Sequence, residues 1–266
     1  MKRKHRKWIE YLARAGLTGR GLVYLMVAAI AVQLPFGGSG SADREGALAS
    51  ISTQPWGTPL LIALAVCFAG YAAWRLVEAV LDPENKSKDP KGKWMRLGYL
   101  FRAGLYSSFA ISTLRFTFTR RSEPSDQQTQ ETTAGVLGLP FGKWLVLGFG
   151  AGVVAVGLYN GYRAVSQNYR KDFKQQEMSR RECKTLFPLA AVGLTARAAV
   201  FLLIGGFLIN AALSYDPGRA VGLDGALHRV AASPGGPLML TAIAAGLAAF
   251  GIFSLAQARY RRIMNS

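Results

Sequence analysis

The sequence predicts an all-α, polytopic membrane protein whose six transmembrane helices form three tandem two-helix repeats. Half of the 266 residues are hydrophobic, and they gather into blocks of about 20 residues, the length that crosses a bilayer core as a helix. Short related segments recur along the chain at nearly constant intervals. Lys and Arg concentrate in alternate connections between the blocks, which is the charge asymmetry of a protein that crosses a membrane several times.

Six apolar blocks are the predicted transmembrane spans, because only a helix satisfies its own backbone hydrogen bonds in a membrane without closing into a barrel. They cover residues 13–34, 56–80, 97–118, 143–165, 186–213 and 237–257. The third block is the weakest of the six, since Arg102 and Arg115 both oppose insertion. Support for this span comes from the internal repeat.

The repeat is visible at the start of both helices in each unit. Each odd-numbered block opens with a Gly-Leu pair, in ARAGL at 13–17, FRAGL at 101–105 and AAVGL at 190–194. Each even-numbered block follows a Pro-x-Gly segment, PWG at 55–57, PFG at 140–142 and PGG at 234–236, and proline is tolerated at a helix start. We therefore expect one membrane domain, 1–266, with units of about 11–82, 96–166 and 186–262, each reading helix, polar loop, Pro-x-Gly, helix.

The distribution of Lys and Arg predicts the orientation. Twenty of these residues lie in 1–16, 82–96, 167–185 and the C-terminal tail, whereas the other connections hold five beside seven acidic residues. Since Lys and Arg favour cytoplasmic loops, both termini are predicted to be cytoplasmic, with 82–96 and 167–185 as basic cytoplasmic connections. A cleaved signal peptide is the alternative reading of the N-terminus. It is disfavoured because the GLT segment of the first block recurs at 193–195.

Arginines inside the spans are the candidate binding residues. Arg197 lies about 16 Å along its span, near the middle of a roughly 30 Å hydrocarbon core, so we expect it to be buried against a partner or a water-filled cavity. Arg20 occupies the matching position of the first unit. Tyr24 and Phe201 follow these arginines by four residues, which puts a ring on the same helical face as each guanidinium group.

The remaining charged residues of the spans lie closer to helix ends. Glu78 is predicted to pair with Arg75 or to reach Arg14, Arg20 or Arg102 on a neighbouring helix. Arg102 joins the candidate binding set. Long side chains near a helix end can extend to the headgroups, so the interfacial basic residues are expected to be Arg14, Arg75 and Arg163.

Small residues predict close helix packing in the fourth span. Gly148 and Gly152 are four residues apart, as are Gly157 and Gly161, and such spacing lets neighbouring backbones approach. A binding cavity lined by backbone is the alternative interpretation of this glycine-rich segment.

The sequence carries no recognisable catalytic or metal-binding motif. His5 and His228 both lie outside the spans, which leaves a haem between the helices without histidine ligands. HExxH, paired CxxC and Walker A patterns are absent. We therefore expect no enzymatic activity, no cofactor and no metal. The net charge of +17 lacks a nucleic-acid-binding signature and is explained by membrane topology.

The chain resembles the bacterial integral membrane proteins grouped as domain of unknown function 1206. ARAGLTGRGLVYLMVAAIAV in the first unit and GLTARAAVFLLIGGFLI in the third carry the resemblance, which extends from about residue 11 to 262. It implies three two-helix units in the bacterial inner membrane and adds no reaction. The second unit departs from the pattern because Ser108 stands where the other units have arginine.

Two functions are compatible with these features. The first is a structural or interaction protein whose basic cytoplasmic face contacts anionic lipid headgroups or an acidic protein partner. The second is a small transporter or channel in which Arg20 and Arg197 line an intramembrane site for an anion or an anionic lipid. The sequence specifies neither a protein partner nor an oligomeric state, and an intramembrane enzyme is the least supported alternative.

Overall fold

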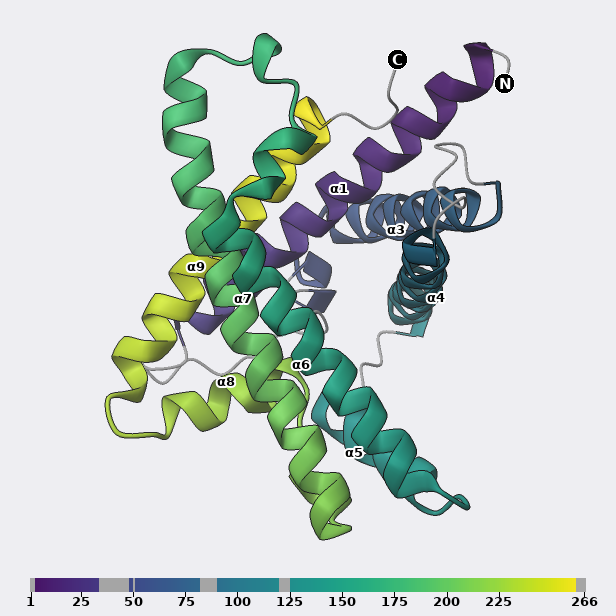
Figure 1. Cartoon of the computed structure of the whole chain (residues 1–266), viewed down its shortest axis with the longest axis vertical. Coiled ribbons are helices and arrows are strands. Elements are labelled where there is room, and N and C mark those ends of the chain that lie inside the picture. Colours follow the sequence, from purple (N-terminus) through teal and green to yellow (C-terminus); the bar gives the residue numbers. More distant parts are fainter. Residues whose placement is uncertain (1–2, 34–47, 50, 82–89, 120–124, 262–266) are drawn as a thin grey trace.

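The computed structural model describes residues 3–33, 48–49, 51–81, 90–119 and 125–261, and this part of the chain is all-α, as predicted. Its long helices cross one another at varied angles (Figure 1). They are α1 (Arg3–Ala31), α3 (Gly57–Leu81), α4 (Pro90–Thr119), α6 (Gly142–Ser166), α7 (Arg180–Ser214) and α9 (Gly236–Tyr260). Residues 82–89, in the first predicted basic connection, lie outside the described ranges.

Short helices occupy segments that the sequence predicted as polar loops, and this is a correction. They are α5 (Ser125–Leu137), α8 (Leu223–Ala231), and the 3₁₀ turns η3 (Asn168–Asp172), η4 (Gln175–Glu177) and η5 (Pro217–Arg219). Asp126 and Asp224 lie in the first turns of α5 and α8. A carboxylate there interacts favourably with the helix dipole, which is a local reason for helix formation that a loop assignment overlooks.

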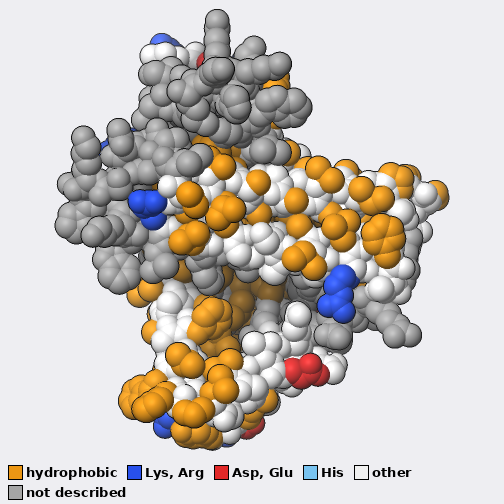
Figure 2. Space-filling model, turned by 90° about the vertical axis from the view of Figure 1, so that its right-hand side faces the viewer, with side chains coloured by type: hydrophobic (Ala, Val, Ile, Leu, Met, Phe, Trp, Pro, Cys, Tyr) orange, Lys and Arg blue, Asp and Glu red, His pale blue; other side chains and the backbone are white. Residues whose placement is uncertain are grey.

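Four of the described helices, α3, α6, α7 and α9, are long and apolar enough to cross a membrane. The helices α1 and α4 contain 29 and 30 residues and carry more charged side chains. Large apolar side chains such as Trp144, Phe149 and Leu158 are exposed, and Figure 2 shows apolar side chains spread over an outward face with few charges among them. Soluble monomers rarely expose so much apolar surface, whereas lipid covers it well.

The Pro-x-Gly segments form the same turn in all three units. The glycine N–H donates to the carbonyl three residues earlier, from Gly57 to Gln54 (2.9 Å), Gly142 to Leu139 (2.8 Å) and Gly236 to Ser233 (2.7 Å). A Cβ atom at any of the three glycines would collide with a backbone carbonyl oxygen of the preceding short segment. The turn therefore requires glycine, and it starts α3, α6 and α9 alike.

The long helices pack in a cyclic order with one missing neighbour pair. The second helix of each unit packs on the first helix of the next, as α3 on α4, α6 on α7 and α9 on α1. Within units, α1 packs on α3 and α7 packs on α9, but α4 and α6 make no extensive contact. Figure 1 shows α4 beside α3 and away from α6. The helices therefore pack in the order α4, α3, α1, α9, α7, α6, and the two helices at the ends of this order are not packed together.

Glycines permit the closest helix contacts. Gly193 of α7 lies against the backbone of Phe250, where an added Cβ would come within 2.5 Å of the Phe250 nitrogen. Gly16 of α1 meets the Tyr71 side chain of α3 in the same way. Gly104, the corresponding residue of α4, has no atom within 4 Å of an added Cβ. The second unit, whose helices α4 and α6 are separated, is thus the unit whose glycine contacts no neighbouring helix among the described residues.

The connection between α6 and α7 folds back onto the end of α9. Tyr169 is fully buried and donates to the Phe187 carbonyl at 2.7 Å. Burial raises the pKa of the Tyr169 phenol, which keeps the donated hydrogen in place. The Lys174 N–H donates to the Tyr260 carbonyl at 2.9 Å, and an isolated bridge pairs Phe173 with Arg261. These contacts fix the segment 167–185 against the C-terminal end of the last helix.

Candidate functional site

Arginines from four segments gather where α1, α3, α7 and α9 meet. Arg20 projects from α1, Arg75 from α3 and Arg197 from α7, and Arg261 follows the end of α9. Each is partly or fully buried. We call the set of Arg20, Arg75, Arg197, Arg261 and the nearby Arg102 the arginine cluster, and the contacts of each member decide what the cluster can do.

Arg20 is held by polar side chains of α9. Its Nε donates to Ser254 Oγ at 2.9 Å and its Nη2 donates to Gln257 Oε1 at 2.5 Å. The guanidinium carbon lies 5.3 Å from the centre of the Phe250 ring. The i+4 spacing predicted Tyr24 as the aromatic neighbour of Arg20, but the ring that Arg20 contacts belongs to another helix. Both hydrogen-bond acceptors are neutral, so the charge of Arg20 is not balanced by them.

Arg197 lies among aromatic rings. Its guanidinium carbon is 4.6 Å from the ring centre of Phe250, 5.0 Å from that of Phe201 and 5.5 Å from that of Tyr24. The Tyr24 and Phe250 rings meet edge to face at 4.7 Å. The Nε atom of Arg197 is buried without a hydrogen-bond partner. Cation–π contact therefore accounts for the position of Arg197, and no carboxylate in the described part of the chain pairs with it.

Arg75 and Glu78 form a buried ion pair on α3. Arg75 is 4% exposed, donates to a Glu78 carboxylate oxygen and donates to the Tyr71 hydroxyl at 2.6 Å. Of the partners considered from sequence for Glu78, the local one is observed. The sequence predicted an interfacial position for Arg75, whereas the structure buries this side chain between helices. Its neighbours Tyr71 and Tyr99 cover the guanidinium group with their rings, which makes burial of the pair possible.

Arg102 and Arg261 extend the cluster. Arg102 of α4 is exposed and lies within electrostatic reach of Arg75 and Arg197. Arg261 lies within reach of Arg75 and Arg20, and burial, followed by the charge of Arg75, lowers the pKa of its guanidinium group. These like charges repel one another, so the cluster favours a negative group that touches several of them.

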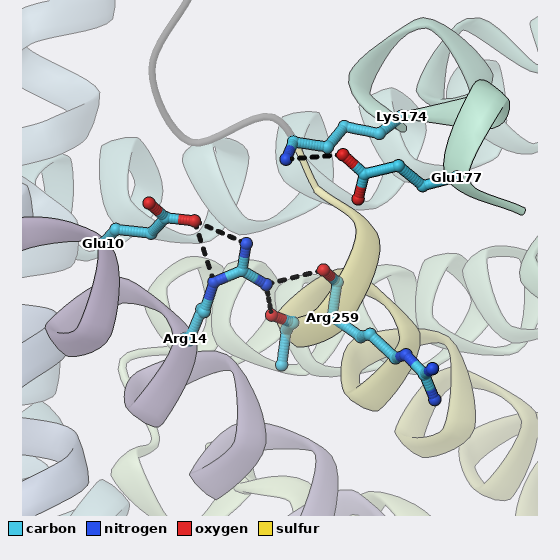
Figure 3. Close-up of polar contacts among 6 residues, drawn as sticks. Glu10, Arg14, Lys174, Glu177 and Arg259 are labelled. Atoms are coloured by element: carbon cyan, nitrogen blue, oxygen red, sulfur yellow. Dashed lines mark hydrogen bonds and ion pairs between the residues drawn. The ribbon is translucent and has the colours of Figure 1, made fainter. Parts of the chain in front are cut away.

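Arg14 joins the start of α1 to the end of α9. Figure 3 shows its guanidinium group between the Glu10 carboxylate and two carbonyl groups of α9. Arg14 pairs with Glu10 at 2.5 Å, and donates to the carbonyl oxygens of Ala258 and, at 2.6 Å, Arg259. Cations at a helix C-terminus bind the unpaired carbonyl groups and interact favourably with the dipole. Arg14 therefore stabilises the contact of the first helix with the last one.

The other predicted packing and interfacial residues lie on α6. Arg163 pairs with Asp172 of η3 at 3.2 Å. Gly157 is buried against Leu202 and Ala198 of α7, and Gly161 lies near Ala198. Gly148 and Gly152 have no atom within 4 Å of an added Cβ. The backbones of α6 and α7 approach most closely at Gly150 and Gly205, two residues that the glycine spacing did not single out.

The residues of α9 that contact the arginines were not predicted from the sequence. Phe250, Ser254 and Gln257 are buried, and they lie more than 200 residues from Arg20. No local spacing relates them to Arg20. One signal was present in the repeat, because Ser254 stands eighteen residues after the glycine of its Pro-x-Gly turn, as Arg75 does in the first unit. A polar residue that replaces arginine in a buried helix indicates a site that differs between the units.

The described residues offer no group of three or more His, Cys, Asp or Glu side chains placed to hold a metal ion. The chemistry available at the cluster is therefore that of guanidinium, hydroxyl and carboxamide donors. Such donors bind anions, and planar guanidinium groups suit phosphate and carboxylate best.

The family profile described as Domain of Unknown Function (DUF1206) matches the chain three times, over residues 15–82, 97–167 and 192–261. The chain belongs to the DUF1206 family. This confirms the resemblance and the three repeats inferred from the sequence. The chain is also 31% identical, over 99% of its length and 95% of the relative, to "Uncharacterized protein YxxB" of Bacillus subtilis strain 168. No solved structure matches it.

The three DUF1206 segments make the arginine cluster a site between units. Arg20 belongs to the first segment, Arg102 to the second, and Arg197 and Gln257 to the third. Arg20 and Arg197 hold corresponding positions, four residues after Gly16 and Gly193. Their neighbours differ, since Arg20 bonds neutral polar groups and Arg197 contacts rings. The DUF1206 repeat therefore brings two corresponding arginines, Arg20 and Arg197, to one place, where their neighbouring side chains differ.

Proposed function

We propose that this DUF1206 protein crosses the bacterial inner membrane six times, with both termini in the cytoplasm, and binds anionic lipid headgroups at its basic cytoplasmic face. The observation that carries this proposal is the meeting of predicted cytoplasmic segments at one end of the molecule. Arg14 of α1, Lys174 of the connection between α6 and α7, and Arg261 after α9 all make contacts there. Segments that contact one another beyond the ends of the spans lie on the same side of the membrane, which is the side predicted to be cytoplasmic.

Six crossings are supported by the repeat and by packing. The helices α1 and α4 begin their units as α7 begins the third, and α7 is apolar and long enough to cross. Both α1 and α4 pack along α3, another helix of this kind. Helices that share a packing partner and a place in the repeat are expected to share its environment.

The opposite end has a different character. Here α5 contacts both η5 and α8, and the Gly222 N–H donates to Asp126 Oδ1 at 2.7 Å. Arg219 is engaged by Asp216 and Asn210. Arg219 at this end thus has an acidic and an amide neighbour, whereas Lys171, Arg181 and Lys184 at the other end are exposed. An anionic bilayer surface attracts the second group, by about 1 kcal/mol for each basic residue near it.

The orientation is tested by cysteine labelling in intact cells. In a chain with Cys67 and Cys183 replaced by serine, Gln128→Cys on α5 should react with a membrane-impermeant maleimide from outside the inner membrane. Gln175→Cys, in η4, should react only after the cells are broken. Labelling of Gln128→Cys only after lysis would exclude an outward loop after α4.

Lipid binding is tested by thermal unfolding of the purified protein with phosphatidylglycerol or phosphatidylcholine. Phosphatidylglycerol should raise the unfolding temperature more than phosphatidylcholine does. Salt at 0.5 M should reduce this difference, because it shortens the Debye length to about 4 Å and screens exposed charges. The variant Lys171→Gln/Arg181→Gln/Lys184→Gln should lose much of the difference. Its control, Arg219→Gln/Arg229→Gln at the opposite end, should retain it. Equal effects of the two lipids on the wild type would overturn the proposal.

Anion transport is a second candidate function. It is favoured by one observation, that Arg20 and Arg197 both lie against the Phe250 ring between α1, α7 and α9. Internal cations of this kind line the pathways of anion transporters. Release of a trapped anion from proteoliposomes containing the wild type, and its loss in Arg197→Gln, would support transport. Release equal to that from empty liposomes would exclude it for the anion used.

A further inference from the structure

The arginine cluster has more positive charge than its surroundings neutralise. Among the described residues, Glu78 is the carboxylate bonded inside the cluster, and it is already paired with Arg75. Arg75 also donates to the Tyr71 hydroxyl. Arg20 bonds a hydroxyl and a carboxamide. The side chains of Arg102 and Arg197 have no hydrogen-bond acceptor in the described part of the chain. Asp172 of η3 is also within electrostatic reach of Arg261, but it already pairs with Arg163. The cluster therefore holds five arginines near two carboxylates.

This imbalance has a physical cost. A guanidinium group that leaves water loses several kcal/mol of solvation, and an uncompensated one is strongly destabilising. Cation–π contact with a ring is weaker than the hydration that is lost, so the rings around Arg197 offset only part of the loss. Two buried donors, Nε of Arg197 and Nε of Arg75, have no partner. An anion that accepted hydrogen bonds here would supply both the missing charge and the missing acceptors.

The geometry points to a specific internal site: we propose that the arginine cluster binds a phosphate-bearing anion between α1, α7 and α9, with Arg197 and Arg20 as its main ligands. Phosphate presents several oxygens to planar, forked guanidinium donors, which suits a cluster that contributes donors from three helices. Arg102, exposed on α4 and within electrostatic reach of Arg197 and Arg75, adds attraction for an anion. The inference rests on the proposed binding of anionic lipid and assigns the headgroup a defined internal position.

The outer part of the site lies near the depth of a headgroup. Gln257 and Ser254 precede the end of α9 at Tyr260 by three and six residues, which is about 5 Å and 9 Å of helix. The polar headgroup layer on each side of a bilayer is about 5–7 Å thick. A lipid phosphate that enters from the basic side therefore meets Arg20 first, and it must sink below the headgroup layer to reach Arg197, which lies beside Phe250, about 15 Å of helix from Tyr260. A free phosphate ion has the same chemistry and is the other possible source.

The test compares site variants with a surface control. Purified wild type and the variants Arg197→Gln, Arg197→Lys, Arg102→Gln and Arg219→Gln are titrated with phosphatidylglycerol, phosphatidylcholine and inorganic phosphate, and bound lipid is counted by native mass spectrometry. Arg219 is an exposed residue at the opposite end of the molecule, so its variant removes one basic charge outside both the cluster and the basic face. Arg102→Gln keeps the test valid if Arg197→Gln fails to fold, because Arg102 is exposed.

The expected result is a loss of phosphatidylglycerol affinity by about tenfold in Arg197→Gln, the loss of one good charge-assisted contact. Arg197→Lys should recover part of it, Arg102→Gln should lose about threefold, and Arg219→Gln should bind as the wild type does. Binding of inorganic phosphate alone with the same pattern would support the site and identify a free anion as its ligand.

Two outcomes would overturn the internal site. If Arg197→Gln and Arg102→Gln bind phosphatidylglycerol like the wild type, the site is wrong while lipid binding at the basic face stands. If Arg219→Gln loses as much affinity as Arg197→Gln, the binding is a general effect of net charge. Absence of any preference for phosphatidylglycerol in the wild type would instead remove the proposed function itself.

Discussion

At the scale of single residues, the ion pair of Arg75 and Glu78 shows how a charge is kept inside this protein. The pair lies between α3 and its neighbours, and both residues are buried. The Tyr71 hydroxyl accepts a hydrogen bond from Arg75, and the Tyr71 and Tyr99 rings flank the guanidinium group. Removing one partner of such a pair leaves the other charge buried without compensation.

We expect Glu78→Gln to destabilise the protein by about 3 kcal/mol, because Arg75 then remains charged and buried without its carboxylate. The measurement is thermal unfolding of the detergent-solubilised protein. The double variant Arg75→Met/Glu78→Leu should unfold at a higher temperature than Glu78→Gln, since it removes both charges together. A double variant less stable than the single one would show that the pair contributes more than charge compensation.

The sequence predicted the buried arginines better than their partners. The i+4 spacing correctly indicated that Phe201 lies beside Arg197, because both residues are on one helix and the helical repeat determines their distance. The same reasoning failed for Arg20, whose ring neighbour is Phe250 of α9. Contacts within a helix follow from spacing, whereas contacts between helices depend on packing that a single sequence does not specify.

At the scale of helices, the start of α7 is determined by a capping box. Ser179 Oγ accepts from the Glu182 N–H at 3.2 Å, and Glu182 Oε2 accepts from the Ser179 N–H at 2.6 Å. The two bonds satisfy two backbone donors that the first turn leaves unpaired. They also set where the connection from α6 ends, which is where the basic segment 167–185 meets α9.

Loss of this cap should be measurable in thermal unfolding. Ser179→Ala removes the acceptor of the Glu182 N–H and should cost about 1 kcal/mol. The control is Thr185→Ala in the same helix, whose hydroxyl donates to the Arg181 carbonyl and closes no free end. Its effect should be smaller, within about 0.5 kcal/mol. Equal losses in the two variants would contradict a capping role for Ser179.

The long helices could be predicted from the sequence and their short companions could not. Apolar blocks and Pro-x-Gly segments gave the starts of α3, α6 and α9, because the turn before each needs glycine for steric reasons. The polar residues of α5 gave no apolar periodicity, and this helix is ordered by contacts with η5 and α8. Tertiary contacts of this kind override local composition.

At the scale of the whole molecule, the three repeats do not pack alike. Fourteen residues after the glycine of the Pro-x-Gly turn stand Tyr71 in the first unit, Val156 in the second and Phe250 in the third. Tyr71 and Phe250 pack against the glycine that opens their unit, whereas Val156 is 42% exposed and no described atom lies near Gly104. The sequence predicted the repeat, and the opening glycine is present in all three units. The aromatic residue that packs on this glycine is present in the first and third units, whose helices are in contact.

The separation of α4 from α6 is tested by a matched pair of glycine substitutions. Gly193→Ala places a Cβ against the Phe250 backbone, and overpacking of this kind should cost about 1–3 kcal/mol in thermal unfolding. Gly104→Ala adds the same methyl group where no atom lies within 4 Å. It should be neutral or stabilise the protein by up to about 1 kcal/mol, because alanine is the better helix former. A destabilisation by Gly104→Ala as large as that by Gly193→Ala would mean that α4 packs against α6 through this glycine, and that the helices close into a complete ring.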